Sequence, residues 1–383
     1  MSEAIHLEIS GIEHLEQGYR IHWQLSRDSR ILSVQPLEIT YDFAPPRSPF
    51  YPTHNLLALV LPVLANEFPI LEISVRWPID LRLSSYWAGV LRALRIPERD
   101  VRWDIPTLGT SFQDQPGPAE PGTRSGLLFG GGIESMFALS VLYADRPVLI
   151  SVLGEAWMNN DPRTYRIKRA LEDDLVASHG VHLERVTSNA LSLIRKEDLY
   201  KNYFVTGLLF YWHSLPVCRQ FQVHTLYKSS EMEEALNFRY QDLSLHPTFL
   251  KHIRYEGEPL FLPLHNCYPK IQMFAELSRT PFLRFIYSCY HNTDRRWCGE
   301  CSKCFRISEF CDRVGIDRAL IGMQGGIVGR RERGPISRHY WDLADLLYGK
   351  RRLHESRLAF EYHKQRALRR LGRAWEHLRK LGS

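Results

Sequence analysis

The feature that most constrains the fold of this chain is a regular alternation of strand-like and helix-like segments after residue 125. Short apolar runs are each followed by a longer segment whose apolar residues have helical spacing. Strands joined through helices imply right-handed crossovers and a parallel sheet covered by helices on both faces. We therefore predict an α/β fold with strands at 127–129, 147–153, 182–186 and 222–226 and helices at 133–143, 164–179 and 203–215.

A segment rich in Gly and Pro, residues 109–124, precedes this pattern and predicts a linker. Before it, strand-like alternation and apolar helical stretches predict an additional N-terminal α/β domain. Its expected strands are 19–25, 37–41 and 70–75, and its expected helices are 55–67 and 83–94. We thus divide the chain into an accessory domain at 1–108, the linker, a main domain at 125–315 and a helical tail at 316–383.

The positive charge of the chain is concentrated in the tail. The net charge is +6, but residues 330–383 hold 15 Lys or Arg against 6 Asp or Glu, which leaves a slightly acidic remainder. Apolar residues among these arginines have the spacing of amphipathic helices. We expect helices that pack one face on the protein. Docking of an acidic partner and nucleic-acid binding are the alternatives, and nucleic acid is the least favoured.

Nothing in the sequence directs the chain to a membrane. Its first residues lack the basic start and apolar run of a secretory signal, and no unbroken apolar run is long enough to cross a bilayer. We therefore expect a cytoplasmic protein. Of the seven cysteines, four crowd into sixteen residues. In a reducing compartment, such a cluster indicates metal binding rather than disulfides.

The four clustered cysteines are Cys289, Cys298, Cys301 and Cys304, with the spacing C-x8-C-x2-C-x2-C. Four thiolates on a short segment can close a tetrahedral shell around Zn²⁺. Because all four positions are filled by protein, the site should be structural. An iron–sulfur cluster and unliganded thiols are the alternatives. The other cysteines, Cys218, Cys267 and Cys311, are expected to be small buried residues.

Three glycines, Gly130, Gly131 and Gly132, lie between the first strand and first helix of the main domain. This arrangement places backbone N–H groups and a helix N-terminus around an anion. Ser135 can add a hydroxyl donor, and Glu134 can hold a Mg²⁺ that bridges phosphates. The segment is neither a Walker A loop nor a G-x-G-x-x-G motif. A simple tight turn is the alternative.

The glycine segment resembles the signature Ser-Gly-Gly-x-Asp-Ser of the PP-loop ATP pyrophosphatases. Two positions differ, because Gly130 replaces the serine and Glu134 replaces the aspartate. The carboxylate is kept, whereas one phosphate-binding hydroxyl is lost. The resemblance implies a Rossmann-like (HUP/PP-loop) sheet and an ATP site formed by Gly130, Gly131, Gly132, Glu134 and Ser135.

The cysteine spacing, together with Ser288 and Tyr290, resembles 7-cyano-7-deazaguanine synthase (QueC), a PP-loop family with a C-terminal zinc site. The resemblance covers about residues 125–315. Lys201-Asn202 looks like the family's Arg-Asn pair, and Pro263-Leu264 followed by Lys270 resembles its Pro-Leu…Lys segment. Arg306 lies one residue from the arginine that follows the family's zinc motif. The N-terminal region and the basic tail lie outside that family's core.

The resemblance implies that a 7-deazaguanine carboxylate attacks the α-phosphate of ATP and that an amine then displaces AMP; in the parent family, a second ATP dehydrates the amide to a nitrile. Glu134, Ser135, Lys270 and Lys201 are the expected catalytic residues, and Asn202 and Arg306 would help bind the nucleotide. Loop amides and Mg²⁺ would hold the leaving pyrophosphate. For Lys201, Lys270 and Arg306, a solvated surface charge is the alternative.

The added domains suggest a specialised relative from a bacterial antiphage operon, such as type IV CBASS or Qat, with an amine of a partner protein as acceptor. Three other hypotheses remain. The chain can be a catalytically degenerate nucleotide-binding scaffold in a defence complex, a synthase of 7-cyano-7-deazaguanine for tRNA queuosine, or an enzyme that activates another carboxylate.

Overall fold

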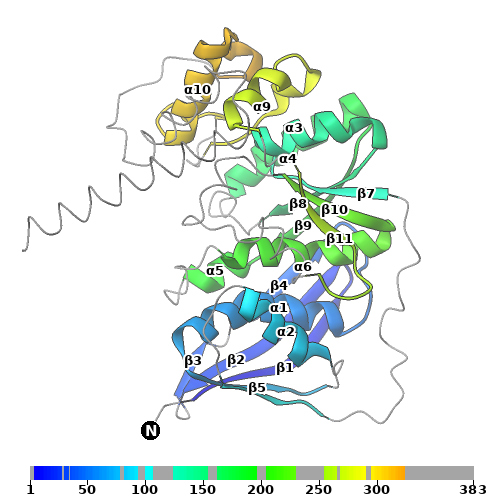
Figure 1. Ribbon diagram of the computed structural model, residues 1–383, viewed down its shortest axis with the longest axis vertical. Coiled ribbons are helices and arrows are strands. Elements are labelled where there is room, and N and C mark those ends of the chain that lie inside the picture. Colours follow the sequence, from blue (N-terminus) through cyan, green and yellow to red (C-terminus); the bar gives the residue numbers. More distant parts are fainter. Residues whose placement is uncertain are drawn as a thin grey trace, which may run out of the picture.

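The computed structural model describes residues 4–27, 30–33, 35–77, 82–93, 100–106, 124–153, 162–195, 204–229, 254–264, 268–289 and 295–323. Its strands are β1 (Ile5–Leu15), β2 (Gly18–Arg27), β3 (Arg30–Ser33), β4 (Leu37–Tyr41), β5 (Ile70–Val75), β6 (Asp100–Asp104), β7 (Arg124–Leu128), β8 (Val148–Leu153), β9 (His182–Ser188), β10 (Val223–Ser229) and β11 (Leu260–Leu264). They form one eleven-stranded mixed sheet in the order β11-β10-β7-β8-β9-β4-β2-β1-β5-β6, with β3 on β2 (Figure 1). The architecture is therefore α/β with a mixed, mostly parallel sheet.

The half of the sheet from β7 to β11 is parallel throughout. Chain order starts at β7, runs outward through β8 to β9, and then returns to β10 on the other side of β7. This reversal of chain order between the neighbouring strands β7 and β10 is a topological switch point, where open α/β sheets bind ligands. The helices α3 (Ile133–Leu142) and α4 (Pro162–His179) pack on one face, and α6 (Phe204–Gln220) packs on the other.

The half from β1 to β6 contains both antiparallel and parallel strands. The antiparallel strands β1, β2 and β4 are followed by β5 and β6, which run parallel to β1. The helices α1 (Phe50–Glu67) and α2 (Arg82–Ala93) belong to the core on one face. Residues on the other face alternate as half-buried or exposed polar side chains, so this half has a single buried face.

The two halves are joined by strand pairing and by helix packing. β4 pairs with β9 in antiparallel register, with Ile39 opposite Ser188. The Asn189 side chain fastens this junction, because it accepts from Glu38 N at 2.9 Å and donates to Pro36 O at 3.0 Å. α1 packs along α6, and the two helices run side by side in Figure 1.

Six further helical elements lie in the described part of the chain. They are η1 (Tyr143–Asp145), α5 (Ala190–Arg195), α9 (Lys270–Leu277), η5 (Pro281–Phe285), α10 (Ser302–Val314) and η6 (Arg318–Ile321). With α3, the last four of these build the second hydrophobic core around the cysteine residues 289–304. None of the described helices is long and apolar enough to cross a membrane.

The expected α/β class is confirmed, although the whole sheet is mixed rather than parallel. The expected helix at 55–67 begins earlier, at Phe50, because prolines are tolerated in a first helical turn. The helix expected at 203–215 runs on to Gln220 through Pro216. The division into domains stays a prediction. The expected linker before Arg124 and the tail beyond Met323 lie outside the described residues.

Candidate functional site

The glycine loop, residues 130–132, connects β7 to α3 at the carboxyl edge of the parallel strands (Figure 1). Gly131 has a φ of 76°, a conformation that residues with a side chain rarely adopt. A Cβ on Gly132 would lie 3.2 Å from Glu134 Oε2 and 3.3 Å from Ser288 Oγ. A Cβ on Gly130 would meet no described atom within 4 Å, so packing does not require glycine there.

The loop ends at the N-terminus of α3, with Gly132 as the N-cap. The first intrahelical bond runs from Met136 N to Gly132 O at 3.0 Å, and N–H groups earlier in the turn have no acceptor within the helix. The Ser135 hydroxyl donates to Gly132 O at 3.2 Å and is buried, so in this structure it closes the turn. The amides of the first turn are therefore the groups of this loop that are available to an anion.

Glu134 and Lys270, two residues singled out from the sequence, form an ion pair. Lys270 is the first residue of α9 and is buried, whereas 20% of the Glu134 side chain stays exposed beside the loop. Burial raises the pKa of Glu134, but the positive charges of Lys270 and Lys303 outweigh burial and bring this pKa to about 2. Glu134 is therefore a carboxylate at neutral pH, the form that ligates Mg²⁺.

The sulfur atoms of Cys289, Cys298, Cys301 and Cys304 all lie within 4.8 Å of one another. The Sγ of Cys304 is 3.8 Å from that of Cys298 and 3.6 Å from that of Cys301. A tetrahedral zinc with bonds of about 2.3 Å places its sulfur ligands about 3.8 Å apart. A cluster of several irons would hold them further apart. The four thiols therefore fit a single metal ion such as zinc.

Backbone N–H groups around these sulfurs favour thiolates. Cys298 N donates to Cys289 Sγ at 3.4 Å, and Cys301 N donates to Cys298 Sγ at 3.3 Å. Gly299, with a φ of 75°, provides the turn between two of the cysteines.

The cysteines also act on one another in the absence of a metal. Hydrogen bonding with Cys301 is the largest effect that raises the pKa of the Cys289 thiol, to about 12. Metal binding must therefore displace protons from the cluster.

The cysteine cluster and the glycine loop are joined by three consecutive residues. Tyr287 N donates to Gly131 O at 2.7 Å, Ser288 Oγ lies next to Gly132, and Cys289 is the first thiol. Arg296 supports the same segment, because its Nε donates to Ile286 O at 3.1 Å. The cysteine cluster thus lies beside the glycine loop, and its first thiol, Cys289, is two residues from the direct backbone contact of Tyr287 with the loop.

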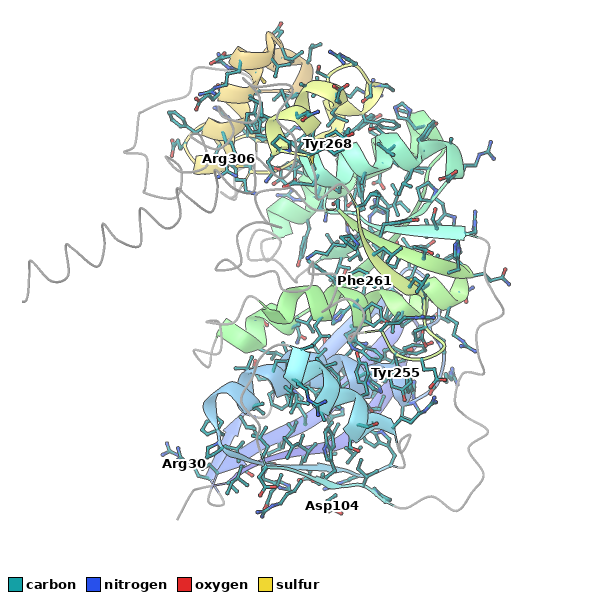
Figure 2. All side chains as sticks on the ribbon, in the orientation of Figure 1. Arg30, Asp104, Tyr255, Phe261, Tyr268 and Arg306 are labelled. Atoms are coloured by element: carbon teal, nitrogen blue, oxygen red, sulfur yellow. The ribbon has the colours of Figure 1, made fainter. Side chains whose placement is uncertain are left out.

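The other residues expected at the site are placed differently. Arg306, labelled in Figure 2, lies half-buried on α10, two residues after Cys304. Lys201 and Asn202 lie outside the described residues. Cys218 and Cys311 are buried, as predicted.

Sequence reasoning missed two lysines near the loop. Lys303 stands between two cysteine ligands, and its charge acts on Glu134. Its place inside the C-x2-C motif is a signal that could have identified it. Lys168 is a buried residue of α4 that lines a small pocket next to Gly131. Its i,i+4 spacing to Glu172 is typical of an exposed helical ion pair, so the sequence held no clear signal for it.

Comparisons of the chain with models of protein families, with curated proteins and with solved structures found no match.

Proposed function

We propose that this protein is a QueC-like, ATP-dependent enzyme that adenylates a 7-deazaguanine carboxylate and joins it to an amine. The amine is ammonia or an amino group of a partner protein, and the setting is a bacterial antiphage operon such as type IV CBASS or Qat. The observation that carries this proposal is the glycine loop after β7, beside the switch point, with Glu134 held as a carboxylate at its edge.

The geometry supports binding of a nucleoside triphosphate at this edge of the sheet. Open α/β sheets bind ligands outside the carboxyl ends of their strands at a switch point, and here a glycine loop and a helix N-terminus lie at that point. Glu134 would hold the Mg²⁺ that accompanies ATP, and this ion would neutralise charge on the phosphates. Lys270, already in contact with Glu134, would then contact the leaving pyrophosphate.

The proposed reaction has two displacement steps. A carboxylate oxygen of the substrate attacks the α-phosphorus, the bond to the bridging oxygen of the β-phosphate breaks, and pyrophosphate leaves. The amine then attacks the acyl carbon, AMP leaves with the former carboxylate oxygen, and the amine loses a proton. The protein contributes positioning and charge neutralisation, from the loop amides and from cations such as Lys270.

The cysteine cluster would hold zinc in a structural role. Four thiolates complete the tetrahedral shell, so no coordination position remains for a substrate. Its contribution would be the position of Tyr287 and Ser288, which contact the glycine loop.

A nucleotide-binding scaffold without turnover is the second candidate. Two observations favour it: Gly130 lacks the hydroxyl of the PP-loop signature, and Lys270 already neutralises the carboxylate that would hold Mg²⁺. Synthesis of 7-cyano-7-deazaguanine uses the same first step as our proposal and differs in its nitrile product, which requires a second ATP.

The test uses the purified full-length protein with ATP, Mg²⁺ and 7-carboxy-7-deazaguanine, alone, with ammonium, and with candidate partner proteins. AMP and pyrophosphate are measured by chromatography, and the partner proteins by intact mass. We expect equal amounts of AMP and pyrophosphate, and a loss of about 100-fold or more in their rate in Glu134→Gln. ATP binding without AMP under every pairing would favour the scaffold.

The matched control is Glu276→Gln. Glu276 lies on α9, as Lys270 does, but pairs with the exposed Arg279 at 2.9 Å. The AMP rate of this variant should equal that of the unmodified protein. An equal loss in both variants would show that the effect is not specific to Glu134.

A further inference from the structure

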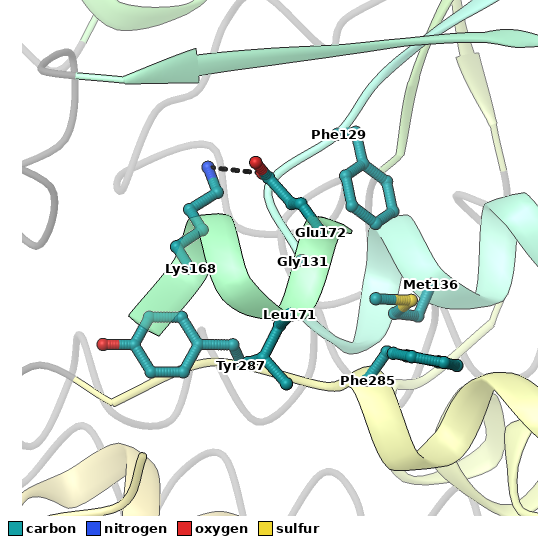
Figure 3. Close-up of a pocket in the computed structure, with 8 residues that line it drawn as sticks. All are labelled: Phe129, Gly131, Met136, Lys168, Leu171, Glu172, Phe285 and Tyr287. Carbon is teal, nitrogen blue, oxygen red and sulfur yellow. Dashed lines mark ion pairs between the residues drawn. The ribbon is translucent and has the colours of Figure 1, made fainter. Parts of the chain in front are cut away.

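A small pocket lies between the glycine loop, α4 and the segment that leads to the cysteine cluster (Figure 3). Gly131, Lys168, Glu172 and Tyr287 provide its polar or backbone lining, and the rest of the lining is apolar. It has room for about one water molecule, and hence for one oxygen atom of a larger group. The pocket is therefore too small for a whole phosphate but large enough for one phosphate oxygen.

Lys168 is the unusual residue of this pocket. It is only 2% exposed, and its ammonium donates no hydrogen bond to any residue of the described part of the chain. An ammonium has three donors, and leaving them unfilled in a buried position is costly. Consistent with this, burial lowers the pKa of Lys168, although Glu172 opposes the shift. A ligand that accepts from the ammonium would remove this cost.

Glu172 does not accept a hydrogen bond from the ammonium of Lys168. Its Oε1 lies 3.7 Å from Lys168 Nζ, beyond hydrogen-bond distance. Other donors engage both carboxylate oxygens: Ser151 Oγ at 2.5 Å and Arg185 Nε at 2.8 Å. The carboxylate is thus shared between two cations, and the ammonium of Lys168 is left with unused donors beside the glycine loop (Figure 3).

The position of the pocket defines the group that Lys168 can bind. Gly131 lines the same pocket, and the next residue, Gly132, caps α3. An anion over the loop would therefore receive N–H groups from α3 and an ammonium from α4. A phosphate suits this arrangement, because one of its oxygens can enter the pocket while the others remain over the loop amides.

We propose that Lys168 binds a phosphate group of the nucleotide over the glycine loop, with one phosphate oxygen in the pocket beside Gly131. This inference rests on the proposed function, and it assigns to that site a cation that the sequence motifs do not mark. Lys168 and Lys270 approach the loop from different helices, α4 and α9, so each would neutralise its own part of the triphosphate.

The test is calorimetric titration of the full-length protein with inorganic pyrophosphate and, separately, with a non-hydrolysable ATP analogue and Mg²⁺. In Lys168→Met, we expect the affinity for both ligands to fall about 10-fold to 100-fold, because one charge-assisted hydrogen bond is lost. The thermal midpoint without ligand should stay the same or rise, because a buried charge without hydrogen bonds is removed. Unchanged affinities in Lys168→Met would overturn the inference, as would no binding by the unmodified protein.

Arg169→Met is the matched control, because Arg169 is the exposed next residue of the same helix. Its affinities should equal those of the unmodified protein. Equal losses in both variants would mean that the positive charge of α4 acts only at long range, and would contradict a contact with Lys168.

A second variant keeps the inference testable if Lys168→Met does not fold. Glu172→Gln retains Lys168 and removes the nearest negative charge, so the affinity for pyrophosphate should rise. If Lys168 serves only to pair with Glu172, this affinity will not rise, and the inference fails.

The same experiments separate the inference from the proposed function. If the protein binds pyrophosphate through Lys168 but forms no AMP, the inference stands and the proposed adenylation fails. If AMP is formed at the same rate with Lys168→Met, the proposed function stands and the inference fails. Titration with 7-carboxy-7-deazaguanine alone should give the same affinity in Lys168→Met as in the unmodified protein; a selective loss of this affinity would assign Lys168 to the carboxylate instead.

Discussion

The two halves of the sheet differ in how many of their faces are buried. β7–β11 are parallel strands, and hydrophobic cores lie on both of their faces. β1–β6 bury one face under α1 and α2, while the other carries ion pairs such as Arg20–Glu38 at 2.8 Å. This difference indicates which half of the sheet can form a ligand-binding site. Among the residues that the structure describes, only the doubly covered half has a switch point, a glycine loop and buried charged groups around that loop.

The largest effect should come from the cysteine cluster, which belongs to the doubly covered half alone. Cys301→Ser should abolish stoichiometric zinc and strongly lower the thermal midpoint, because structural zinc contributes about 10–16 kcal/mol of binding free energy in small peptides. Zinc is measured by plasma emission spectroscopy and the midpoint by calorimetry. Cys311→Ala is the control: it also changes a buried cysteine of α10, but should keep the metal. Full zinc in Cys301→Ser would refute the assignment.

A second experiment asks whether the two halves unfold as one unit. Leu57 on α1 and Leu139 on α3 are both fully buried, but in the cores of opposite faces. Each change to alanine should cost about 2–5 kcal/mol. Because β4 pairs with β9 and α1 packs on α6, we expect calorimetry to show one transition that both variants lower. Two transitions, each moved by only one variant, would instead support independent domains at 1–108 and 125–315.

A third prediction concerns the contact between the halves. Glu258, in the turn before β11, accepts from Tyr51 Oη of α1 at 3.2 Å and is buried. Burial raises its pKa from 4.5 to about 7, so the folded state is favoured by protonation. This contribution is complete below pH 4.5 and is lost as the pH rises through 7.

The free energy of unfolding of Glu258→Gln, measured relative to the unmodified protein, should therefore be higher at pH 8 than at pH 4.5. The expected increase is up to about 3 kcal/mol. The comparison is the difference between urea midpoints of the variant and the unmodified protein at each pH. A difference that does not change with pH would show that Glu258 keeps its ordinary pKa.

Much of the doubly covered half could be predicted from the sequence. Strands buried on both faces are nearly continuous apolar runs, as in residues 148–153, which only Ser151 interrupts, and the helices between them have clear spacing. The cysteine cluster followed from ligand spacing alone. The pairing of β4 with β9 could not be predicted, because no local pattern encodes an antiparallel contact between distant segments.

The candidate site was predicted in part, for a similar reason. Glu134 and the glycines are adjacent in the chain, so a motif reveals them. Lys168 reaches the loop only through the packing of α4 on the sheet, and Lys303 only through the fold of the cysteine segment. Long-range placement, rather than residue type, decides which lysines lie near the loop.

We propose that the doubly covered half activates a carboxylate by adenylation. The most direct test supplies 7-carboxy-7-deazaguanine labelled with ¹⁸O in its carboxylate, together with ATP, Mg²⁺ and the amine acceptor, and measures the mass of the AMP released. We predict AMP that carries one ¹⁸O, because the carboxylate oxygen bonded to the α-phosphorus leaves with AMP. Unlabelled AMP, or no AMP with any acceptor, would contradict it.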